Sequence, residues 1–450
     1  MTGPLFGQSG GSGLSARQPI QKGGLFPPRF AASELRGVRR GGRRKRRGNK
    51  PRCRKGRRKQ TRRKGFQLRL IALVRVPLSG RISVVNRAAA TVAAGLACAM
   101  LTQGVHAAAS TTAHDIGDVQ QAADSVAQVD GVVGVIGEAY YDGRRIGRGS
   151  AGSRLIGGQG GKVPSDARYR AWSQTKQMTA TVLLQLVKEG KLGVDDTLGK
   201  VLPITVGQDL VERAGEITIR QLLHHRSGVP DYNGPGSTDL RPFDDLTTRH
   251  TWTELAKISR GTPRTSEPDA RYAYSNTNYI LLGAIIEKLT GNTLAEEFER
   301  RLFTPLRMTR TYLPTRPDQG IKGPHGHGYY PRPDGTLRDV DRINPTTMWA
   351  AGGVISTARD LTTFHRALAQ GRLLPANLRD LVEYPDHKGS VCGGTVGLFT
   401  GSGPGGNAVT FTSADGRLQL AVDVTTSTRA QPTLRPAIFQ AAEDVLCPDR

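Results

Sequence analysis

The sequence predicts a mixed α/β (α+β) fold, in which one sheet is assembled from segments far apart in the chain. β-rich segments occur early, at residues 132–141 and 144–150, and again near the end, between residues 395 and 425. From about residue 195 to residue 380 the pattern is mainly helical, with Pro/Gly-rich loops. We therefore expect helices packed on the faces of the sheet and a helical subdomain beside it.

The first elements follow from local patterns. Residues 115–129 predict an opening helix. Residues 132–141 are rich in β-forming residues with an alternating pattern, Asp142-Gly143 supplies a turn, and residues 144–150 return, which predicts a hairpin. The next helix is predicted from Ser173 to about Gly190, because an apolar helical pattern ends with a basic residue and glycine.

The later elements complete the predicted fold. Helices are expected at residues 218–225, 278–289, 293–302 and 358–369. Strands are expected at residues 395–399, 408–412 and 418–425, followed by a closing helix at residues 433–446. The glycine-rich residues 401–406 precede a strand rather than a helix, so a phosphate-binding loop is not expected.

Charge is distributed unevenly along the 450 residues, whose formal net charge is +26. Residues 1–110 contain 25 Lys and Arg and one acidic residue, Glu34, whereas the remainder has 39 basic and 37 acidic residues. The Arg/Lys/Gly run at residues 36–64 has no hydrophobic periodicity and predicts disorder. A nucleic-acid-binding arm is an alternative for this run, but no aromatic residues are interleaved for stacking, and no nucleic acid is expected to bind the folded domain.

A secretory signal peptide is predicted at residues 81–109. Arg81 and Arg87 precede an apolar run at residues 88–101, which is too short to span a bilayer, and small residues follow at 105–109. We expect a basic leader at 1–80 that reflects a start codon assigned too far upstream, and a folded domain at 110–450. The domain is then secreted and cell-wall associated, without a stable membrane anchor. A lipoprotein site at Cys98 is an alternative that the preceding residues fit poorly.

Two cysteines, Cys392 and Cys447, fall in the predicted domain. An even pair in an exported protein suggests a disulfide between the last strand region and the closing helix. Two free buried thiols are the alternative.

The segment Ser173-Gln174-Thr175-Lys176 carries the main chemical signal, although S-x-x-K alone is a weak motif. The spacing puts both side chains on one face of a helix. The helix N-terminus offers unpaired N–H groups to a developing oxyanion. A desolvated Lys176 could lose its proton and serve as the base.

A second group of functional residues lies about a hundred residues later. Tyr274 and Asn276 stand two positions apart, just before a predicted helix. A tyrosine hydroxyl near a lysine ammonium can be stabilised as a phenolate, which makes Tyr274 a second candidate base. The amide of Asn276 can hold a substrate carbonyl or orient the lysine.

The order S-x-x-K, Y-x-N and a late T-G resembles that of the penicillin-recognising serine hydrolases. Within them the chain is similar to the group of class C β-lactamases and secreted D-alanyl-D-alanine carboxypeptidases. The similarity covers about 330 residues, with matching segments at 179–192, 217–232, 272–289 and 350–361. It implies a beta-lactamase/transpeptidase-like antiparallel sheet flanked by helices, with an inserted all-helical subdomain and no cofactor or metal. The placement of Cys392 and Cys447 is similar to that in secreted carboxypeptidases of the group.

The resemblance implies a role for each residue. Ser173 would attack an acyl carbonyl to give an acyl-enzyme that water releases, while Lys176 and Tyr274 share proton transfer. Asn276 would position the substrate amide. The oxyanion hole would use the backbone N–H groups of Ser173 and Ser402.

Two departures from the group bear on specificity. The third motif normally opens with lysine or histidine, whereas Phe399-Thr400-Gly401 occupies that place here. A phenyl ring cannot attract a carboxylate, although Thr400 keeps its hydroxyl and Gly401 allows close backbone approach. His387-Lys388-Gly389 is the alternative third motif. Trp172 replaces a small residue before the nucleophile and would narrow or reshape the cleft.

The sequence therefore predicts an exported serine acyl-hydrolase, with D-alanyl-D-alanine carboxypeptidase activity on cell-wall peptides as the leading interpretation. An esterase or amidase related to β-lactamases, acting on small esters, amides or β-lactams, is the alternative. A non-catalytic protein that binds cell-wall peptides is the other. His225 is expected to be structural. His325 and His327 have no acidic or cysteine partner close by in the sequence, so no metal site is predicted there.

Overall fold

The computed structural model describes residues 115–234, 245–382, 390–428 and 432–448. The predictions for the leader, the signal peptide and Cys98 lie outside these residues, as does the alternative third motif at residues 387–389. Along the described ranges, no helix is both long enough and apolar enough to cross a membrane.

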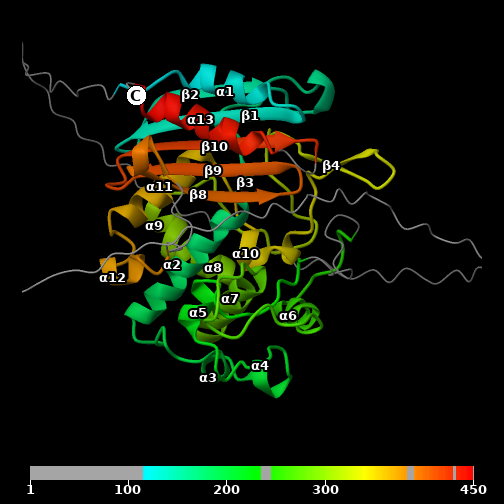
Figure 1. Cartoon of the computed structure of the whole chain (residues 1–450), viewed down its shortest axis with the longest axis vertical. Helices are drawn as coiled ribbons and strands as arrows, with labels where there is room; N and C mark the ends of the chain where they lie inside the picture. Colours follow the sequence, from blue (N-terminus) through cyan, green and yellow to red (C-terminus); the bar gives the residue numbers. More distant parts are fainter. Residues whose placement is uncertain (1–114, 235–244, 383–389, 429–431, 449–450) are drawn as a thin grey trace, which may run out of the picture. The chain divides into compact units, whose positions relative to one another are not determined.

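A six-stranded antiparallel sheet organises the fold, with strand order β2-β1-β10-β9-β8-β7 (Figure 1). Early and late segments meet where β1 pairs with β10, with Ile136 opposite Asp423. The predicted joining of distant segments into one sheet is thus confirmed. The strands are β1 (Val132–Tyr141), β2 (Arg144–Gly152), β7 (Ser390–Val391), β8 (Val396–Gly403), β9 (Gly406–Ser413) and β10 (Leu418–Thr426).

Helices cover both faces of the sheet because its strands alternate between two apolar cores. Val135 and Val409 face one core, which they share with α1 (Val119–Ala127) and α13 (Leu434–Leu446). The neighbouring residues Ile136 and Ala408 face the other core. That second core contains residues of α2 (Thr175–Lys188) and α11 (Ala358–Ala369). The sheet is therefore the middle layer of a three-layer arrangement.

A helical region adjoins the second core and corresponds to the predicted subdomain (Figure 1). α2 and α7 (Asn276–Thr290) contact each other and are apolar or buried along most of their length, as expected for central helices. The other helices are α3 (Leu198–Val201), α4 (Ile204–Gly207), α5 (Ile219–Leu223), α6 (Trp252–Arg260), α8 (Leu294–Phe298), α9 (Thr304–Leu306), α10 (Trp349–Gly352) and α12 (Ala376–Arg379).

Short elements connect these layers. Two small antiparallel pairs form between β3 (Tyr169–Arg170) and β6 (Ile355–Ser356), and between β4 (Tyr329–Pro331) and β5 (Leu337–Asp339). The single-turn 3₁₀ segments are η1 (Ile156–Gly158), η2 (Trp172–Gln174), η4 (Pro345–Thr347) and η5 (Cys392–Gly394), and η3 (Glu299–Phe303) is a π-helix.

The predicted disulfide is present in the structure. Cys392 in η5 is bonded to Cys447, which follows α13 directly, and the two Cα atoms are 5.7 Å apart. The bond therefore ties the β7 edge of the sheet to the end of the closing helix, across 55 residues of sequence.

Removing this disulfide is expected to lower stability. A double Cys392→Ser/Cys447→Ser variant should lose roughly 2–4 kcal/mol of unfolding free energy, because the unfolded chain regains loop-closure entropy. Thermal unfolding should move down by about 5–10 °C, and the reduced wild type should match the variant. An unchanged midpoint in both would contradict a stabilising role for the bond.

Candidate active site

Ser173 lies in η2, at the entry to α2. The preceding residue Trp172 has φ 48°, which places a bulky non-glycine residue in the left-handed region. Ala171 donates its N–H to the Val354 carbonyl, which fixes the segment just before the turn. Trp172 is only 4% exposed, and its ring lies against Gly403, where a Cβ would approach it to 2.3 Å. The indole thus packs against the end of β8.

Lys176 follows one turn later and is fully buried. Its Nζ lies 2.7 Å from Asn276 Oδ1, 2.7 Å from the Ala351 carbonyl oxygen and 3.3 Å from Ser173 Oγ. A neutral amine has two hydrogens and one lone pair. The amide and carbonyl oxygens can take the two hydrogens, which leaves the lone pair for the proton of the Ser173 hydroxyl.

The electrostatics of Lys176 favour this neutral form. Desolvation by burial lowers the pKa of Lys176 to about 7, and the carboxylate of Asp231 offsets part of that effect. A substantial fraction of the amine is therefore unprotonated near neutral pH. This is the protonation state that a general base for Ser173 requires.

Tyr274, which lies just before α7, also contacts the Ser173 hydroxyl. Its phenol oxygen lies 2.7 Å from Ser173 Oγ. Burial and the nearby Asp231 raise the pKa of Tyr274, while the hydrogen bond with Ser173 lowers it in part. Tyr274 consequently keeps its proton at neutral pH, and it is a better proton donor than base.

His225 holds this segment in place. Its Nδ1 accepts the backbone N–H of Ser275, and its ring lies 4.4 Å from that of Tyr274. The side-chain amide of Asn278 is also within 3.2 Å of that nitrogen. These contacts fit the structural role expected for His225.

Asp231 is a site residue that the sequence did not single out. Asn276 donates its amide Nδ2 to Asp231 Oδ2 at 2.9 Å and accepts from Lys176 through Oδ1. Burial raises the pKa of Asp231, against hydrogen bonds from Asn233 and Asn276 and the charge of Lys176. Asp231 therefore fixes the orientation of the Asn276 amide, with the oxygen toward the lysine.

The Ala351 carbonyl is the second feature that sequence reasoning missed. It belongs to α10, which is held against α2 by hydrogen bonds from Thr179 to the Ala350 carbonyl and from Val354 N to Thr175 Oγ1. A backbone acceptor has no signature in the residue type, so the sequence alone does not single it out.

β8 passes directly beside the nucleophile. A Cβ at Gly401 would lie 2.3 Å from the Ala171 carbonyl oxygen and 2.8 Å from Ser173 N, so only glycine fits there. Beyond Gly397, β8 has no partner strand on the β7 side within the described residues. The strand thus presents an edge to Ser173, and Ser402 follows Gly401 on that edge.

Phe399 lies two residues before Gly401 and therefore points to the same face of β8. Its ring stacks on His365 of α11, with ring centroids 4.1 Å apart and planes 12° apart. Burial lowers the pKa of His365 to about 3, so this histidine is neutral at physiological pH. Neither ring provides the positive charge that lysine or histidine would bring to the third motif.

Thr400 and Ser402 line a pocket of about 450 Å³ between β8 and α13. Its lining includes Tyr330 and, on α13, Arg435. Ser173 is not part of the lining, so this pocket adjoins the site but does not contain the nucleophile. The structure thus brings together Ser173, Lys176, Tyr274 and Asn276, with Gly401 beside Ser173 and Phe399 two residues earlier on the same strand.

Comparison with known proteins identifies the family. A family profile described as Beta-lactamase matches residues 119–442, well over half of the chain. The chain belongs to the beta-lactamase family. This family membership makes the protein a relative of serine hydrolases, in agreement with the fold and with the resemblance of the motifs.

Individual relatives of this beta-lactamase family member point to penicillin-binding proteins. Penicillin-binding protein 4 of Amycolatopsis lactamdurans is 31% identical over 232 residues, which are 50% of this chain and 56% of that protein. A putative D-alanyl-D-alanine carboxypeptidase of Escherichia coli (strain K12) is 31% identical over 153 residues, 33% of this chain and 35% of that protein. The chain spans about half or less of the length of these curated relatives.

Solved structures extend the comparison over the whole fold. A D-stereospecific amidohydrolase from Streptomyces sp. has 31% sequence identity and a TM-score of 0.60, covering 74% of this chain and 98% of that chain. The D-amino acid amidase from Ochrobactrum anthropi SV3, complexed with L-phenylalanine amide, has 25% sequence identity and a TM-score of 0.60. The match covers 72% of this chain and 96% of that chain.

Proposed function

We propose that this protein is a serine amide hydrolase that forms an acyl-enzyme and cleaves amides of D-amino acids. The observation that carries the proposal is the convergence of Lys176 Nζ and Tyr274 Oη on Ser173 Oγ, at 3.3 and 2.7 Å. The similarity to a D-stereospecific amidohydrolase over 98% of that chain supports the D-amino acid class.

The chemistry follows from the protonation states. Lys176 takes the proton of the Ser173 hydroxyl as Oγ attacks the carbonyl carbon, and the developing oxyanion is met by the N–H groups of Ser173 and Ser402. When the C–N bond breaks, Tyr274 gives its proton to the leaving nitrogen. Water then releases the acyl group from Ser173, with the same residues moving protons.

The presence of Phe399 favours substrates that carry no free carboxylate on the leaving-group side of the scissile bond. An acid at that position would be desolvated beside a phenyl ring and a neutral His365, without a compensating charge from either. A neutral leaving group such as ammonia or an amine meets no such cost.

D-alanyl-D-alanine carboxypeptidase activity is the second candidate, and the pocket beside β8 favours it. Thr400 and Arg435 both line this pocket. A hydroxyl and a guanidinium are suitable partners for a terminal carboxylate. The substrate would then direct its carboxylate toward α13 instead of toward Phe399.

Two substrates separate these candidates, namely a peptide ending in D-Ala-D-Ala and the same peptide with a C-terminal amide. An amidase should cleave the amidated peptide and D-phenylalanine amide at least as fast as the acid. For a carboxypeptidase, kcat/KM should be roughly 100-fold lower for the amidated peptide than for the peptide acid. Arg435→Gln should lower kcat/KM for the peptide acid by a similar factor and leave that for the amidated peptide unchanged. The L-enantiomer of phenylalanine amide is the control for stereochemistry.

Acyl-enzyme formation is tested by intact mass after incubation with a fluorescent penicillin. One adduct per chain, mapped by peptide digestion to Ser173, is expected. Absence of any adduct, together with no turnover of the peptides or amides, would favour the non-catalytic binding protein over a hydrolase.

Substituting Phe399 is expected to change specificity. Phe399→His keeps a ring that can stack on His365 and adds a hydrogen-bond donor. Release of D-alanine from the acid peptide should rise by about 10-fold or more, while hydrolysis of a simple ester stays within about 2-fold. Phe399→Leu, which adds no hydrogen-bond donor, is the control for the change of side chain. Equal effects on both substrates would show that Phe399 does not set carboxylate recognition.

Export is part of the proposal. The disulfide between Cys392 and Cys447 supports an oxidising compartment, as does the predicted signal peptide. N-terminal sequencing of the protein from culture medium should give a start near residue 110, and recovery from the cytosol alone with residues 1–60 intact would oppose export.

A further inference from the structure

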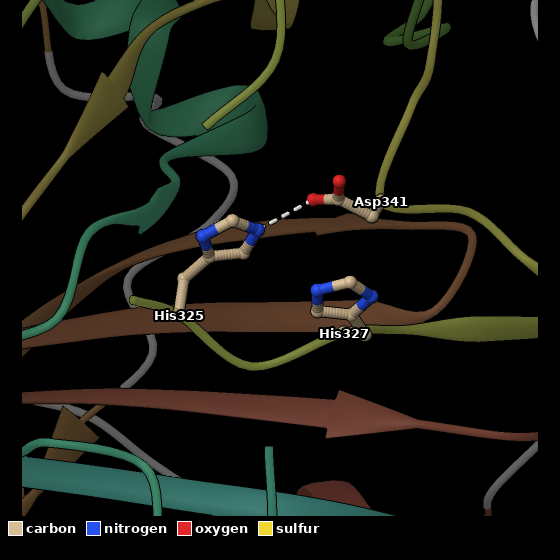
Figure 2. Close-up of side chains that lie close together, drawn as sticks. All are labelled: His325, His327 and Asp341. Carbon is tan, nitrogen blue, oxygen red and sulfur yellow. Dashed lines mark hydrogen bonds and ion pairs between the residues drawn. The ribbon is translucent and has the colours of Figure 1, made fainter. Parts of the chain in front are cut away.

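Two histidines and an aspartate gather at one end of the β4–β5 hairpin (Figure 2). His325 and His327 come just before β4, and Asp341 comes just after β5. Because these strands are antiparallel, with Tyr329 opposite Asp339, the two segments lie at the same end. One potential ligand atom from each of the three residues lies within 4.8 Å of the others.

Both imidazole rings are oriented through Nδ1. His325 Nδ1 lies 2.6 Å from the Gly323 carbonyl oxygen, and a carbonyl can only accept, so this nitrogen carries the proton. His327 Nδ1 lies 2.8 Å from Asp339 Oδ2. Metal-binding histidines are held in this way, with one nitrogen bonded to a carbonyl or carboxylate and the other directed at the ion.

The Nε2 atoms of the two histidines are the nitrogens left to bind an ion. In Figure 2 the outer nitrogen of His325 points at Asp341, and one nitrogen of His327 lies on the side of its ring that faces His325. The two rings are nearly parallel, 9° apart, with centroids separated by 5.1 Å. This leaves both Nε2 atoms and the Asp341 carboxylate around a common point.

The short contact between His325 Nε2 and the Asp341 carboxylate requires a proton or a metal ion between the two atoms. Nε2 of His325 lies 2.6 Å from Asp341 Oδ1, and with the proton on Nδ1 a neutral ring presents a lone pair to a carboxylate. A shared proton resolves that conflict, and so does a metal ion. A tetrahedral ion with ligands at about 2.1 Å separates its ligand atoms by roughly 3.4 Å. The His325–Asp341 pair would therefore move apart by about 0.8 Å, and the His327 nitrogen, which lies within 4.8 Å of the other two atoms, would move in by at most about 1.4 Å.

The surrounding charges are compatible with a dication. Asp339 and Asp341 contribute two carboxylates. Arg170 donates to the Asp341 carbonyl oxygen and Arg154 to the His325 carbonyl oxygen, so these guanidiniums bind backbone groups at the site. With neutral histidines the charges of the two aspartates and of Arg154 and Arg170 sum to zero, so the site carries no net positive charge before an ion binds.

We propose that His325, His327 and Asp341 form a binding site for a divalent transition metal ion, with zinc as the leading ion. Two imidazole nitrogens and one carboxylate oxygen form a donor set typical of zinc, with water in the fourth position. Asp339 and the Gly323 carbonyl act as positioning groups behind the histidines.

The proposed site is structural, because its three residues flank the β4–β5 hairpin and are not among the described hydrogen-bond partners of Ser173, Lys176 or Tyr274. Val340 donates its N–H to the Gly328 carbonyl, and a Cβ at Gly328 would lie 2.1 Å from the Gly405 carbonyl oxygen in the β8–β9 turn. Arg170, which binds next to the site, stands three residues before Ser173. The ion would therefore brace the segments that border the active site.

The test is zinc binding to the untagged full chain, with Cys53 and Cys98, the two cysteines before the predicted domain, alkylated and with metal removed by chelation. Calorimetry should show one zinc ion per chain. His327→Gln, His325→Gln and Asp341→Asn should each weaken this binding by at least about 100-fold, and Asp339→Asn by about 10- to 100-fold. His250→Gln, which changes a histidine outside the cluster, should leave it unchanged.

Thermal unfolding gives a second readout that does not depend on activity. Zinc at a hundredfold excess over its dissociation constant should raise the wild-type midpoint by about 3–5 °C and leave that of His327→Gln in place. Equal binding by wild type and His327→Gln, or no binding by the wild type below about 100 μM zinc, would overturn the proposal. Neither result depends on which amide the enzyme hydrolyses.

Discussion

Replacing Ser173 with alanine is expected to lower kcat/KM by roughly 10⁴- to 10⁶-fold, because no other group can form the acyl-enzyme. The adduct with penicillin should disappear at the same time. Both effects are measured on one preparation, by D-phenylalanine amide hydrolysis and by intact mass.

The controls for Ser173→Ala are structural. The described contacts of Ser173 Oγ are with Lys176 and Tyr274, so the variant should fold with an unfolding midpoint close to that of the wild type. Ser125→Ala, in α1 on the far face of the sheet, should keep full activity. Turnover above about 1% of wild type in Ser173→Ala would exclude Ser173 as the nucleophile.

Lys176 should impose a pH dependence on the reaction. Its pKa is about 7 in the folded protein, and only the neutral amine can accept the serine proton. kcat/KM should therefore fall about 10-fold per pH unit below pH 7 and level off above about pH 8. Activity falls toward low pH because a protonated Lys176 cannot act as a base.

Lys176→Met should lower kcat/KM by about 10²- to 10⁴-fold and remove the acid limb of the profile. Lys176→Arg keeps a positive charge at all these pH values and should be equally impaired, which separates a base from a charge that binds substrate. Lys200→Met, at an exposed lysine on α3, is the matched control. A profile that stays flat through pH 7 would instead point to Tyr274 as the base.

The strands and long helices were predictable because runs of β-forming or helix-forming apolar residues are bounded by turn and cap residues, although β1, β10, α2 and α7 are buried along most of their length. β1 has the predicted bounds, and α11 matches its predicted range. β8 runs on to Gly403, beyond the predicted end at residue 399, because pairing with β9 outweighs the poor strand propensity of its glycines. The helix predicted at residues 293–302 changes from α8 to the π-helix η3 at Glu299, and no residue pattern reports such a change of period.

The candidate site also contains residues that the sequence predicts and others that it does not. Ser173, Lys176 and Tyr274 stand in short motifs whose chemistry can be inferred from residue type. Asp231 and the Ala351 carbonyl act through Asn276 and Lys176, and only the packing of distant segments brings them there. The metal-binding proposal has a similar basis, because the H-x-H spacing is visible in the sequence whereas its aspartate partners arrive through the β4–β5 hairpin.

The contact between the first and last helices has a practical consequence. Gly117, just before α1, donates its N–H to the Val445 carbonyl near the end of α13, and both helices cover the face of the sheet opposite α2. A circular permutant that joins residue 448 to residue 115 through a few glycines should therefore need little rearrangement of either end. Immobilising the enzyme on a support through this junction would leave the reactive serine facing solution.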